Sequence, residues 1–382
     1  MKKTPWFSAL FTVLAVTCIT FGSHGQAQKV ETDIQDIMRQ YDVVGLSVAV
    51  VKDGDISYSN SFGWKDIASQ TPLSNSDIFR IASISKSFTA TALQQLAEAG
   101  KLSLDQDVSS LVGFQVRNPR YPEKVITLKM ILSHTSSIND SQGYFTLDSI
   151  NPAKNPEWAK SYNSYEPGSK YEYCNLNFNM AGTIVEKISG ERFDEYIRHH
   201  ILDPLGLYGG YNIDSLDASR FTTLYAYNPE TGDFSPSPSA YAPRREEIRN
   251  YVMGYSTPVF SPTGGMKMSA TDLARYMTMH MNKGRYKGTK IISKKSAKQM
   301  QQKIAPNGYG LALTTTQDVI PGKALTGHTG SAYGLYSAMF FCPKEKFGFV
   351  VITNGCSAPD SDEYNKALVA AINSLYLNLI KK

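Results

Sequence analysis

Cysteine is scarce in this 382-residue chain, which has four cysteines and no Cys-x-x-Cys pair. Three of them, Cys174, Cys342 and Cys356, follow the first 27 residues. Cys342 and Cys356 belong to one apparent hairpin, in which Cys342 lies near the turn and Cys356 beyond the far end, so the two should not pair. The sequence therefore predicts no disulfide framework and no cysteine-based metal site.

An excess of charge of one sign is also lacking. The formal net charge is +5, and it falls to +3 without Lys2 and Lys3, the charged residues of the first 27. So weak a positive balance does not predict nucleic-acid binding. After residue 27 no run is long and apolar enough to span a bilayer, and the chain has no internal repeat or low-complexity tract. We expect a globular protein whose partner is a small molecule or a peptide, with the oligomeric state left open.

The first 27 residues have the pattern of a secretory signal peptide. Lys2 and Lys3 supply a positive start, Trp6 to Phe21 is an apolar run, and Gly25-Gln26-Ala27 offers small residues for cleavage. A retained membrane anchor is an alternative, but the run is short and contains threonines. Lipid attachment at Cys18 is a second alternative. We expect the mature protein in the periplasm or the extracellular space.

Both ends of the chain contain strand hairpins. Near the start, Asp53-Gly54 is a strong turn signal between an apolar strand at Gly45 to Val51 and a second strand at Ser57 to Gly63. Near the end, Leu335 to Cys342 and Phe347 to Thr353 form a second hairpin. Between about residues 104 and 253, short helical segments and turns dominate instead.

This order predicts a mixed α/β (α+β) fold, with an antiparallel sheet built from both chain ends, flanked by helices, and an inserted, mostly helical region. The corresponding domains are residues 28–103 with 254–382 for the sheet, and 104–253 for the insertion. One further strand is predicted at Tyr309 to Thr315. Helices are predicted at Thr32 to Arg39, Ser83 to Gly100, Thr127 to Ser133, Asn179 to Ile188, Ala270 to Met281, Ser293 to Lys303 and Ser361 to Leu379.

The central chemical feature is Ser83 with Lys86, placed where an extended segment turns into a helix. Residues three apart lie one helical turn apart on one face, so the lysine nitrogen can reach the serine hydroxyl. A serine hydroxyl needs an adjacent base or a lowered pKa to attack a carbonyl, and Lys86 can provide either. A Ser-x-x-Lys quartet also arises by accident, but this is the only one in the chain and a helix follows it.

A second segment can supply a proton-transfer group. Tyr173 and Asn175 follow a Pro-Gly turn on a loop just before a helix. Tyr173 could act as acid or base if nearby cations lower its pKa, and Asn175 could hold Lys86 or a substrate amide. The Tyr-x-Asn pattern also occurs at Tyr58 and at Tyr376, but those two fit regular elements and are better explained by packing.

The third segment is Thr326-Gly327-His328-Thr329-Gly330-Ser331, which leads into the next strand. Its glycines permit close approach to a ligand, and the N–H groups of Ser331 and Ser83 can form an oxyanion hole. His328 could bind the substrate or the Tyr173 oxygen, whereas a lone histidine is commonly structural. Thr329 and Gly330 are candidate substrate-binding residues.

The stretch from Tyr225 to Tyr255 is rich in Tyr, Pro and Ser and has no clear period. One interpretation is an ordered loop that shapes substrate access, with Tyr225 and Tyr255 on the lip of the site. The other is a solvated connector.

Three motifs in order resemble those of the serine β-lactamase and penicillin-binding protein superfamily: Ser83-Ile84-Ser85-Lys86, Tyr173-Cys174-Asn175 and His328-Thr329-Gly330. The similarity is to its class C-like branch of esterases, D-aminopeptidases and DD-peptidases. Supporting segments are Ile131 to Ser136, Asp203 to Leu207, and Pro262 to Met266 leading into Asp272-Leu273-Ala274.

This resemblance implies that Ser83 is acylated, that Lys86 and Tyr173 share the proton transfers, and that Asn175 orients the lysine and the substrate. It implies an oxyanion hole at Ser83 and Ser331, and no metal or cofactor. Two residues depart from the family pattern. His328 stands where true β-lactamases usually have lysine, so we expect little attraction for a substrate carboxylate and weak β-lactam turnover. Ser137 stands where glycine is usual, which could reshape the loop beneath the site.

Three functions follow from these patterns. The first is a serine hydrolase that forms an acyl-enzyme on Ser83 from an ester or amide. The second is an acyltransferase, in which an alcohol or amine intercepts the same intermediate; a water-excluding aromatic lip at residues 225–255 would favour it. The third, a catalytically silent binding protein, fits poorly with an intact set of Ser83, Lys86 and Tyr173.

Overall fold

A tight turn at Asp53 and Gly54 joins the first two strands. In this computed structural model, which describes residues 19–255, 258–357 and 364–381, their φ angles are 54° and 95°. An Asp-Gly pair adopts such angles readily, and they match the twist of a two-residue hairpin. Strands β1 (Gly45–Lys52) and β2 (Asp55–Asp66) therefore pair antiparallel, as predicted.

Side-chain caps mark several helix starts, at Thr127, Ser269, Ser293 and Asn365. The helices are α1 (Ile19–Gln40), α2 (Ser85–Glu98), α3 (Val108–Val112), α4 (Leu128–Leu132), α5 (Asn175–Ser189), α6 (Phe193–Ile197), α7 (Asp203–Leu205), α8 (Arg245–Arg249), α9 (Ala270–Met281), α10 (Lys294–Gln301) and α11 (Lys366–Leu375). The other strands are β3 (Thr71–Pro72), β4 (Phe79–Arg80), β5 (Gly209–Gly210), β6 (Tyr225–Tyr227), β7 (Phe234–Pro236), β8 (Lys267–Met268), β9 (Arg285–Tyr286), β10 (Thr289–Lys290), β11 (Thr314–Thr316), β12 (Leu325–Ala332), β13 (Leu335–Cys342) and β14 (Phe347–Thr353).

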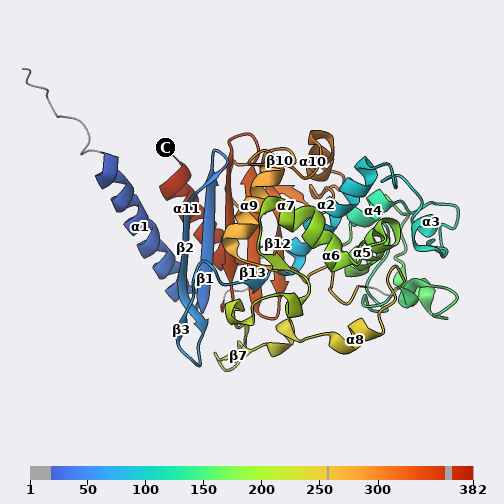
Figure 1. The fold of residues 1–382 in the computed structure, drawn as a ribbon, viewed down its shortest axis with the longest axis horizontal. Helices are drawn as coiled ribbons and strands as arrows, with labels where there is room; N and C mark the ends of the chain where they lie inside the picture. The colour runs from blue at the N-terminus through green and yellow to red at the C-terminus, as the bar shows by residue number, and fades with distance from the viewer. Residues whose placement is uncertain (1–18, 256–257, 358–363, 382) are drawn as a thin grey trace, which may run out of the picture.

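The C-terminal hairpin joins the N-terminal one in a single sheet. β14 pairs with β13 on one side and with β1 on the other, and all of these pairs are antiparallel. The seven strands follow the order β11-β12-β13-β14-β1-β2-β3, so both chain ends build the sheet (Figure 1). This confirms the predicted mixed fold class.

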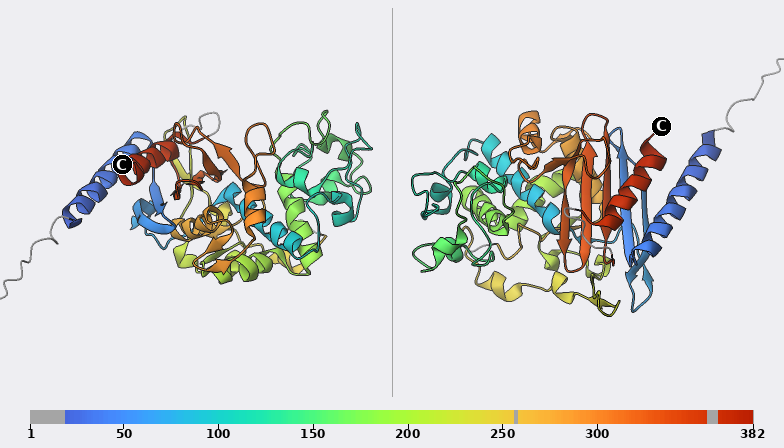
Figure 2. Two further views of the ribbon diagram at one scale, coloured as in Figure 1. Left: turned by 90° about the horizontal axis from the view of Figure 1, so that it is seen from above. Right: turned by 180° about the vertical axis from the view of Figure 1, so that it is seen from behind.

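Helices cover both faces of the sheet. Along β1, Val48 and Val50 share a core with residues of α1 and α11, whereas Ala49 and Val51 share one with residues of α9. The views in Figure 2 show α1 and α11 together on one side of the sheet. Because alternate residues of β1 enter two different cores, its sequence is a continuous apolar run and does not alternate between apolar and polar residues.

The remaining helices surround α2, which packs against α5. Helices α3 to α6 gather at the end of the molecule away from α1 and α11 (Figure 1). Among the described residues, no helix is long and apolar enough to cross a membrane.

Several predicted elements are confirmed, and a few boundaries were wrong. The helix predicted from Thr32 begins at Ile19, and the helix predicted from Asn179 begins at Asn175. The start of the helix predicted from Ser361, and residues 1–18 of the predicted signal peptide with Cys18, lie outside the described residues. No disulfide joins Cys174, Cys342 and Cys356, all of which are buried.

The largest error concerns β12. The third motif was predicted to lie before a strand, but His328 lies in the middle of strand β12. The strand predicted at residues 309–315 is shorter than expected, because β11 contains only Thr314–Thr316. Two glycines and the lack of alternation hid β12. Its pairing with β13 from Thr326 to Ala332 holds it in place.

Candidate active site

A constrained turn carries Ser83. The residue lies in a short 3₁₀ helix (Ala82–Ile84) between β4 and α2, and Ala82 before it has a φ of 48°, which a non-glycine residue seldom adopts. The neighbouring Ile81 is held on both sides. Its N–H donates to the Met266 carbonyl at 2.9 Å, and its carbonyl accepts from the Ser337 hydroxyl at 3.0 Å. These contacts tie the turn to both β13 and the Pro262–Met266 segment.

Lys86 is fully buried beside Ser83. Its Nζ lies 3.1 Å from the Ser83 Oγ, 3.0 Å from the Asn175 Oδ1 and 2.7 Å from the Thr263 carbonyl oxygen. Burial lowers the pKa of Lys86 to about 7, and the charge of Asp140 offsets part of this effect. A substantial fraction of the lysine is therefore neutral near neutral pH.

These three contacts also orient the neutral amine. The Thr263 carbonyl and the Asn175 Oδ1 can only accept, so they take the two N–H groups that a neutral amine has. The lone pair is then left for the hydroxyl proton of Ser83. The geometry is that of a serine activated by an adjacent base.

Asp140 fixes the orientation of Asn175, and sequence reasoning missed it. Its Oδ2 accepts from the Asn175 main-chain N–H at 2.8 Å and from Nδ2 at 3.2 Å, while Oδ1 accepts from the Leu176 N–H at 2.9 Å. Because the amide nitrogen faces this carboxylate, the amide oxygen faces Lys86. Thr263 was also missed, although its hydroxyl donates to the same Asn175 Oδ1 at 2.7 Å. No local pattern signals contacts between residues so far apart in the chain.

Tyr173 lies on the other side of Lys86, whose Nζ is 4.7 Å from the centre of the phenol ring. The prediction that cations lower its pKa is wrong. Burial raises the pKa of Tyr173 well above its ordinary value, and a hydrogen bond with Ser83 offsets only part of that rise. Although 38% of the residue surface is exposed, the phenol is neutral at physiological pH. Tyr173 is thus suited to donate a proton, while Lys86 is suited to accept one.

His328 lines the cavity beside Ser83, but both of its ring nitrogens have partners other than Tyr173. Its Nδ1 faces the Thr329 carbonyl, so Nδ1 carries the hydrogen, and Nε2 accepts from the Tyr309 hydroxyl at 3.0 Å. Burial lowers its pKa to about 4, and the charge of Lys86 adds to this. The imidazole is neutral, as expected from the sequence, but neither ring nitrogen is left for a ligand.

A cavity of about 570 Å³ collects the motif residues. Every member of the predicted site except Lys86, Tyr225 and Tyr255 lines it, and Lys86 lies just beneath Ser83. The lining residues are Arg80, Ser83, Tyr144, Phe145, Tyr173, Asn175, Ser261, Thr263, Gly264, His328, Thr329, Gly330, Ser331, Ala332 and Tyr333. Three segments far apart in the chain thus converge, as the sequence required.

Tyr225 and Tyr255 do not line this cavity, so the structure does not support these two tyrosines as its lip, although other residues of the 225–255 segment line the cavity beside it. Tyr225 is buried beside β2, where its hydroxyl donates to Asp66 at 3.2 Å and accepts from the Ile67 N–H at 2.8 Å. Tyr255 is 53% exposed, with its hydroxyl 3.4 Å from Asp148. The 225–255 segment contains the β6–β7 hairpin and α8 rather than one irregular loop.

Ser137 has a φ of 62°, the left-handed conformation that glycine adopts without strain. The serine keeps this conformation, and its hydroxyl accepts from the Asn118 side chain at 2.9 Å. This explains physically why glycine would suit the position.

Gly330 brings β12 against the Ser83 turn. A Cβ on Gly330 would collide with the Ile81 carbonyl oxygen and would also crowd the Ser337 hydroxyl. We expect Gly330→Ala to push β12 away from Ser83, to destabilise the fold by about 1–3 kcal/mol and to lower kcat/KM by about 10²-fold. Thermal unfolding and ester kinetics measure both effects.

Gly210→Ala is the matched control, because there a Cβ would meet only side-chain atoms, the nearest at 3.7 Å. If Gly330→Ala behaves like Gly210→Ala, the close approach of β12 is not needed.

The described residues contain no group of three or more His, Cys, Asp or Glu side chains that could hold a metal ion.

The chain is similar in sequence and in fold to known proteins. The family model described as Beta-lactamase matches residues 30–374. The chain is 26% identical over 365 residues to "Protein flp" of Staphylococcus aureus (strain MW2), covering 92% of this chain and 66% of that protein. It is 27% identical over 338 residues to "Penicillin-binding protein 4" of Amycolatopsis lactamdurans, covering 83% of this chain and 82% of that protein. This chain thus spans just under two thirds of the first relative's length.

Solved structures share the fold. The octameric penicillin-binding protein homologue from Pyrococcus abyssi superposes with a TM-score of 0.72 at 27% identity, covering 92% of this chain and 77% of that one. EstCE1, described as a hydrolase with promiscuous acyltransferase activity, has a TM-score of 0.72 at 20% identity, covering 93% of this chain and 100% of that one. D-amino acid amidase from Ochrobactrum anthropi SV3 superposes with a TM-score of 0.71 at 20% identity, covering 92% of this chain and 99% of that one.

Proposed function

This chain belongs to the beta-lactamase family, and on that premise we propose that it is a serine hydrolase that forms an acyl-enzyme on Ser83 from an ester or amide. The observation that carries the proposal is the buried Lys86, whose Nζ lies 3.1 Å from the Ser83 Oγ and whose pKa burial lowers to about 7. The partner is a small-molecule or peptide substrate.

Acylation begins when the neutral amine of Lys86 takes the hydroxyl proton of Ser83. The Ser83 Oγ then attacks the substrate carbonyl carbon, and the N–H groups of Ser83 and Ser331 receive the developing oxyanion. The leaving group departs with a proton from the neutral phenol of Tyr173, which regains one from the Lys86 ammonium. Water then attacks the acyl carbonyl carbon and gives a proton to the restored amine of Lys86. The Ser83 Oγ leaves with a proton returned by the Lys86 ammonium, which releases the acid product.

Water is the acceptor that we favour over an alcohol or amine. The argument for acyl transfer depended on an aromatic lip at residues 225–255, and neither Tyr225 nor Tyr255 lines the cavity. EstCE1 is described as having acyltransferase activity, but at 20% identity it supports a shared fold only. β-Lactam turnover is expected to be weak, because the neutral His328 supplies no charge for a substrate carboxylate. Secretion through the predicted signal peptide remains part of this proposal.

A fluorophosphonate probe tests the acyl-enzyme step directly. We expect the probe to add one adduct to the intact mass of the protein and peptide mapping to place that adduct on Ser83, because only an activated serine attacks such phosphorus centres readily. The Ser83→Ala protein should gain no mass.

Ser85→Ala is the control for nearby hydroxyls, since the Ser85 Oγ accepts from the Met266 N–H at 3.0 Å and lies away from the cavity lining. If the wild-type protein keeps its original mass after long exposure to the fluorophosphonate, the proposal is contradicted.

A further inference from the structure

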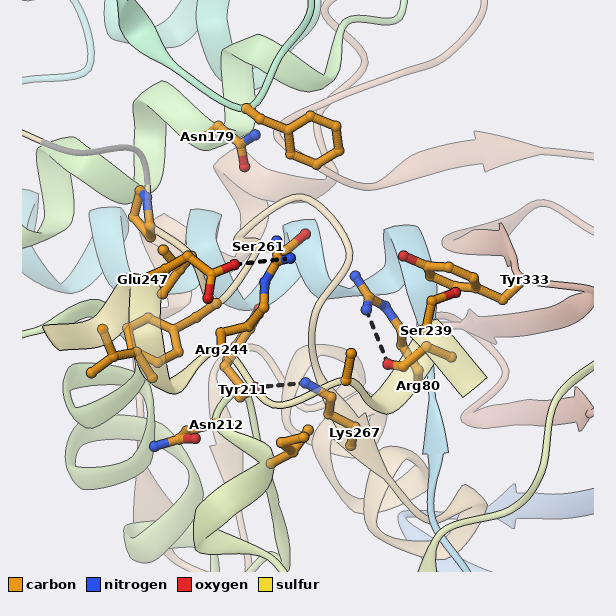
Figure 3. A pocket seen from close by; sticks show the side chains of 18 residues that line it. Arg80, Asn179, Tyr211, Asn212, Ser239, Arg244, Glu247, Ser261, Lys267 and Tyr333 are labelled. Atoms are coloured by element: carbon orange, nitrogen blue, oxygen red, sulfur yellow. Dashed lines mark hydrogen bonds and ion pairs between the residues drawn. The ribbon is translucent and has the colours of Figure 1, made fainter. Parts of the chain in front are cut away.

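A second cavity, of about 490 Å³, adjoins the Ser83 pocket (Figure 3). Arg80, Phe145, Ser261 and Tyr333 line both cavities, so the two meet along these side chains. Its other walls come largely from residues 211–213, 239–248 and 258–261. An acyl group attached to Ser83 can therefore extend past Arg80 into this space.

Lys267 on β8 lines this second cavity although it is only 4% exposed. Its Nζ donates to the Tyr211 carbonyl oxygen at 2.6 Å, and no carboxylate of the described residues lies within ion-pair distance of it. An ammonium group has three donors, so further donors are left for a ligand. Burial lowers the pKa of Lys267 well below its ordinary value, the charges of Arg80 and Arg244 lower it further, and the charge of Asp194 offsets part of this. With one N–H donated to Tyr211, even the neutral amine keeps one donor for a ligand. A bound anion would supply the missing countercharge.

Two arginines face the same space. The Arg80 Nε donates to the Gly264 carbonyl at 3.0 Å and Nη1 to the Ala240 carbonyl at 3.1 Å, and both of these acceptors are uncharged. A guanidinium has five N–H donors, which leaves some for a ligand. Arg244 lies nearby and pairs with Glu247 at 3.3 Å, where both side chains are about half exposed. Figure 3 shows Arg80, Arg244 and Lys267 around the same cavity, with the Lys267 nitrogen turned toward Tyr211 and the Arg244 guanidinium turned toward Glu247.

We propose that this second cavity binds a carboxylate on the acyl part of the substrate, held by Lys267 and Arg80, with Arg244 at the mouth. The inference rests on the proposed function, because it names the substrate class that the Ser83 site would accept. A planar carboxylate matches the fork of a guanidinium and accepts several hydrogen bonds at once. Glu247 is the acidic residue that lines the cavity, and its charge is shared with Arg244. The preferred substrates are therefore esters or amides of dicarboxylic acids.

A matched substrate pair tests the preference. The first substrate is the mono-p-nitrophenyl ester of adipic acid, and the second is the same ester with its free carboxylate capped as a methyl ester. The corresponding pair made from suberic acid varies the length of the chain between the two carboxyl groups. We expect a higher kcat/KM for the free acid, and we expect Lys267→Met to lower the acid-to-ester ratio by about tenfold or more, the usual range for losing a charged hydrogen bond. Lys101→Met, the same substitution at an exposed position, should leave the ratio unchanged.

Direct binding separates this inference from the proposed function. By calorimetry, adipate should bind the Ser83→Ala protein and dimethyl adipate should not, and adding Lys267→Met should abolish the adipate signal. If the fluorophosphonate labels Ser83 but neither an acid preference nor adipate binding is found, the carboxylate site is overturned and the acyl-enzyme stands. Adipate binding without labelling of Ser83 would support the site and overturn the hydrolase proposal.

Discussion

Replacing Lys86 by methionine is expected to lower kcat/KM by about 10² to 10⁴-fold, the range for losing a general base. The Lys86 amine is the group within 3.1 Å of the Ser83 Oγ that can accept its proton. Methionine has a similar length and tolerates burial, but it has no basic nitrogen. Steady-state kinetics with a p-nitrophenyl ester measure the loss, and Lys101→Met serves as the exposed control.

The pH profile gives an independent test of the same role. The pKa of Lys86 is lowered to about 7, so its basic, neutral form increases as the pH rises, and kcat/KM should rise through about pH 7 to a plateau. Other groups around Ser83 titrate elsewhere, since His328 has a pKa of about 4 and that of Tyr173 is raised. A profile that is flat between pH 5.5 and 8.5 would mean that Lys86 is not the base.

The Tyr173→Phe variant is expected to lose roughly 10²-fold or more in kcat, the usual scale of acid assistance. The phenol is neutral because burial raises its pKa, so its contribution is a proton for the leaving group. The loss should therefore be larger for an ethyl ester or an amide, whose leaving groups need a proton, than for a p-nitrophenyl ester, whose leaving group is stable as an anion.

Comparing leaving groups makes this prediction specific to proton donation. A general disturbance of the site would slow all substrates alike, whereas loss of an acid slows them according to the basicity of the leaving group. Tyr227→Phe, on β6 and outside the cavity lining, is the control for removing a tyrosine hydroxyl. Equal losses on both substrate types would indicate a general disturbance of the site and would contradict proton donation by Tyr173.

The reacting groups could be predicted from the sequence because their chemistry is local. Ser83 and Lys86 are one helical turn apart, and the helix that follows them is encoded in the residues up to Gly100. Strand β1 and its turn were equally predictable, since Asp53-Gly54 favours the angles that it adopts. Asp140 and Thr263 could not be predicted, because their only signal is contact with Asn175, which lies 35 and 88 residues away.

By itself, the sequence was enough to predict Ser83, Lys86 and Tyr173 as the reacting residues, and to predict a sheet built from both chain ends, which the structure has. Those features follow from helical spacing, turn chemistry and apolar patterning over short stretches. Only the tertiary structure decided that the pKa of Lys86 is lowered, that the pKa of Tyr173 is raised, and that the His328 ring contacts Tyr309 and the Thr329 carbonyl. It also decided that Tyr225 is a buried packing residue and that Lys267 faces a cavity. The physical reason is that pKa values and hydrogen-bond partners depend on burial, and burial is created by segments that meet only when the chain folds.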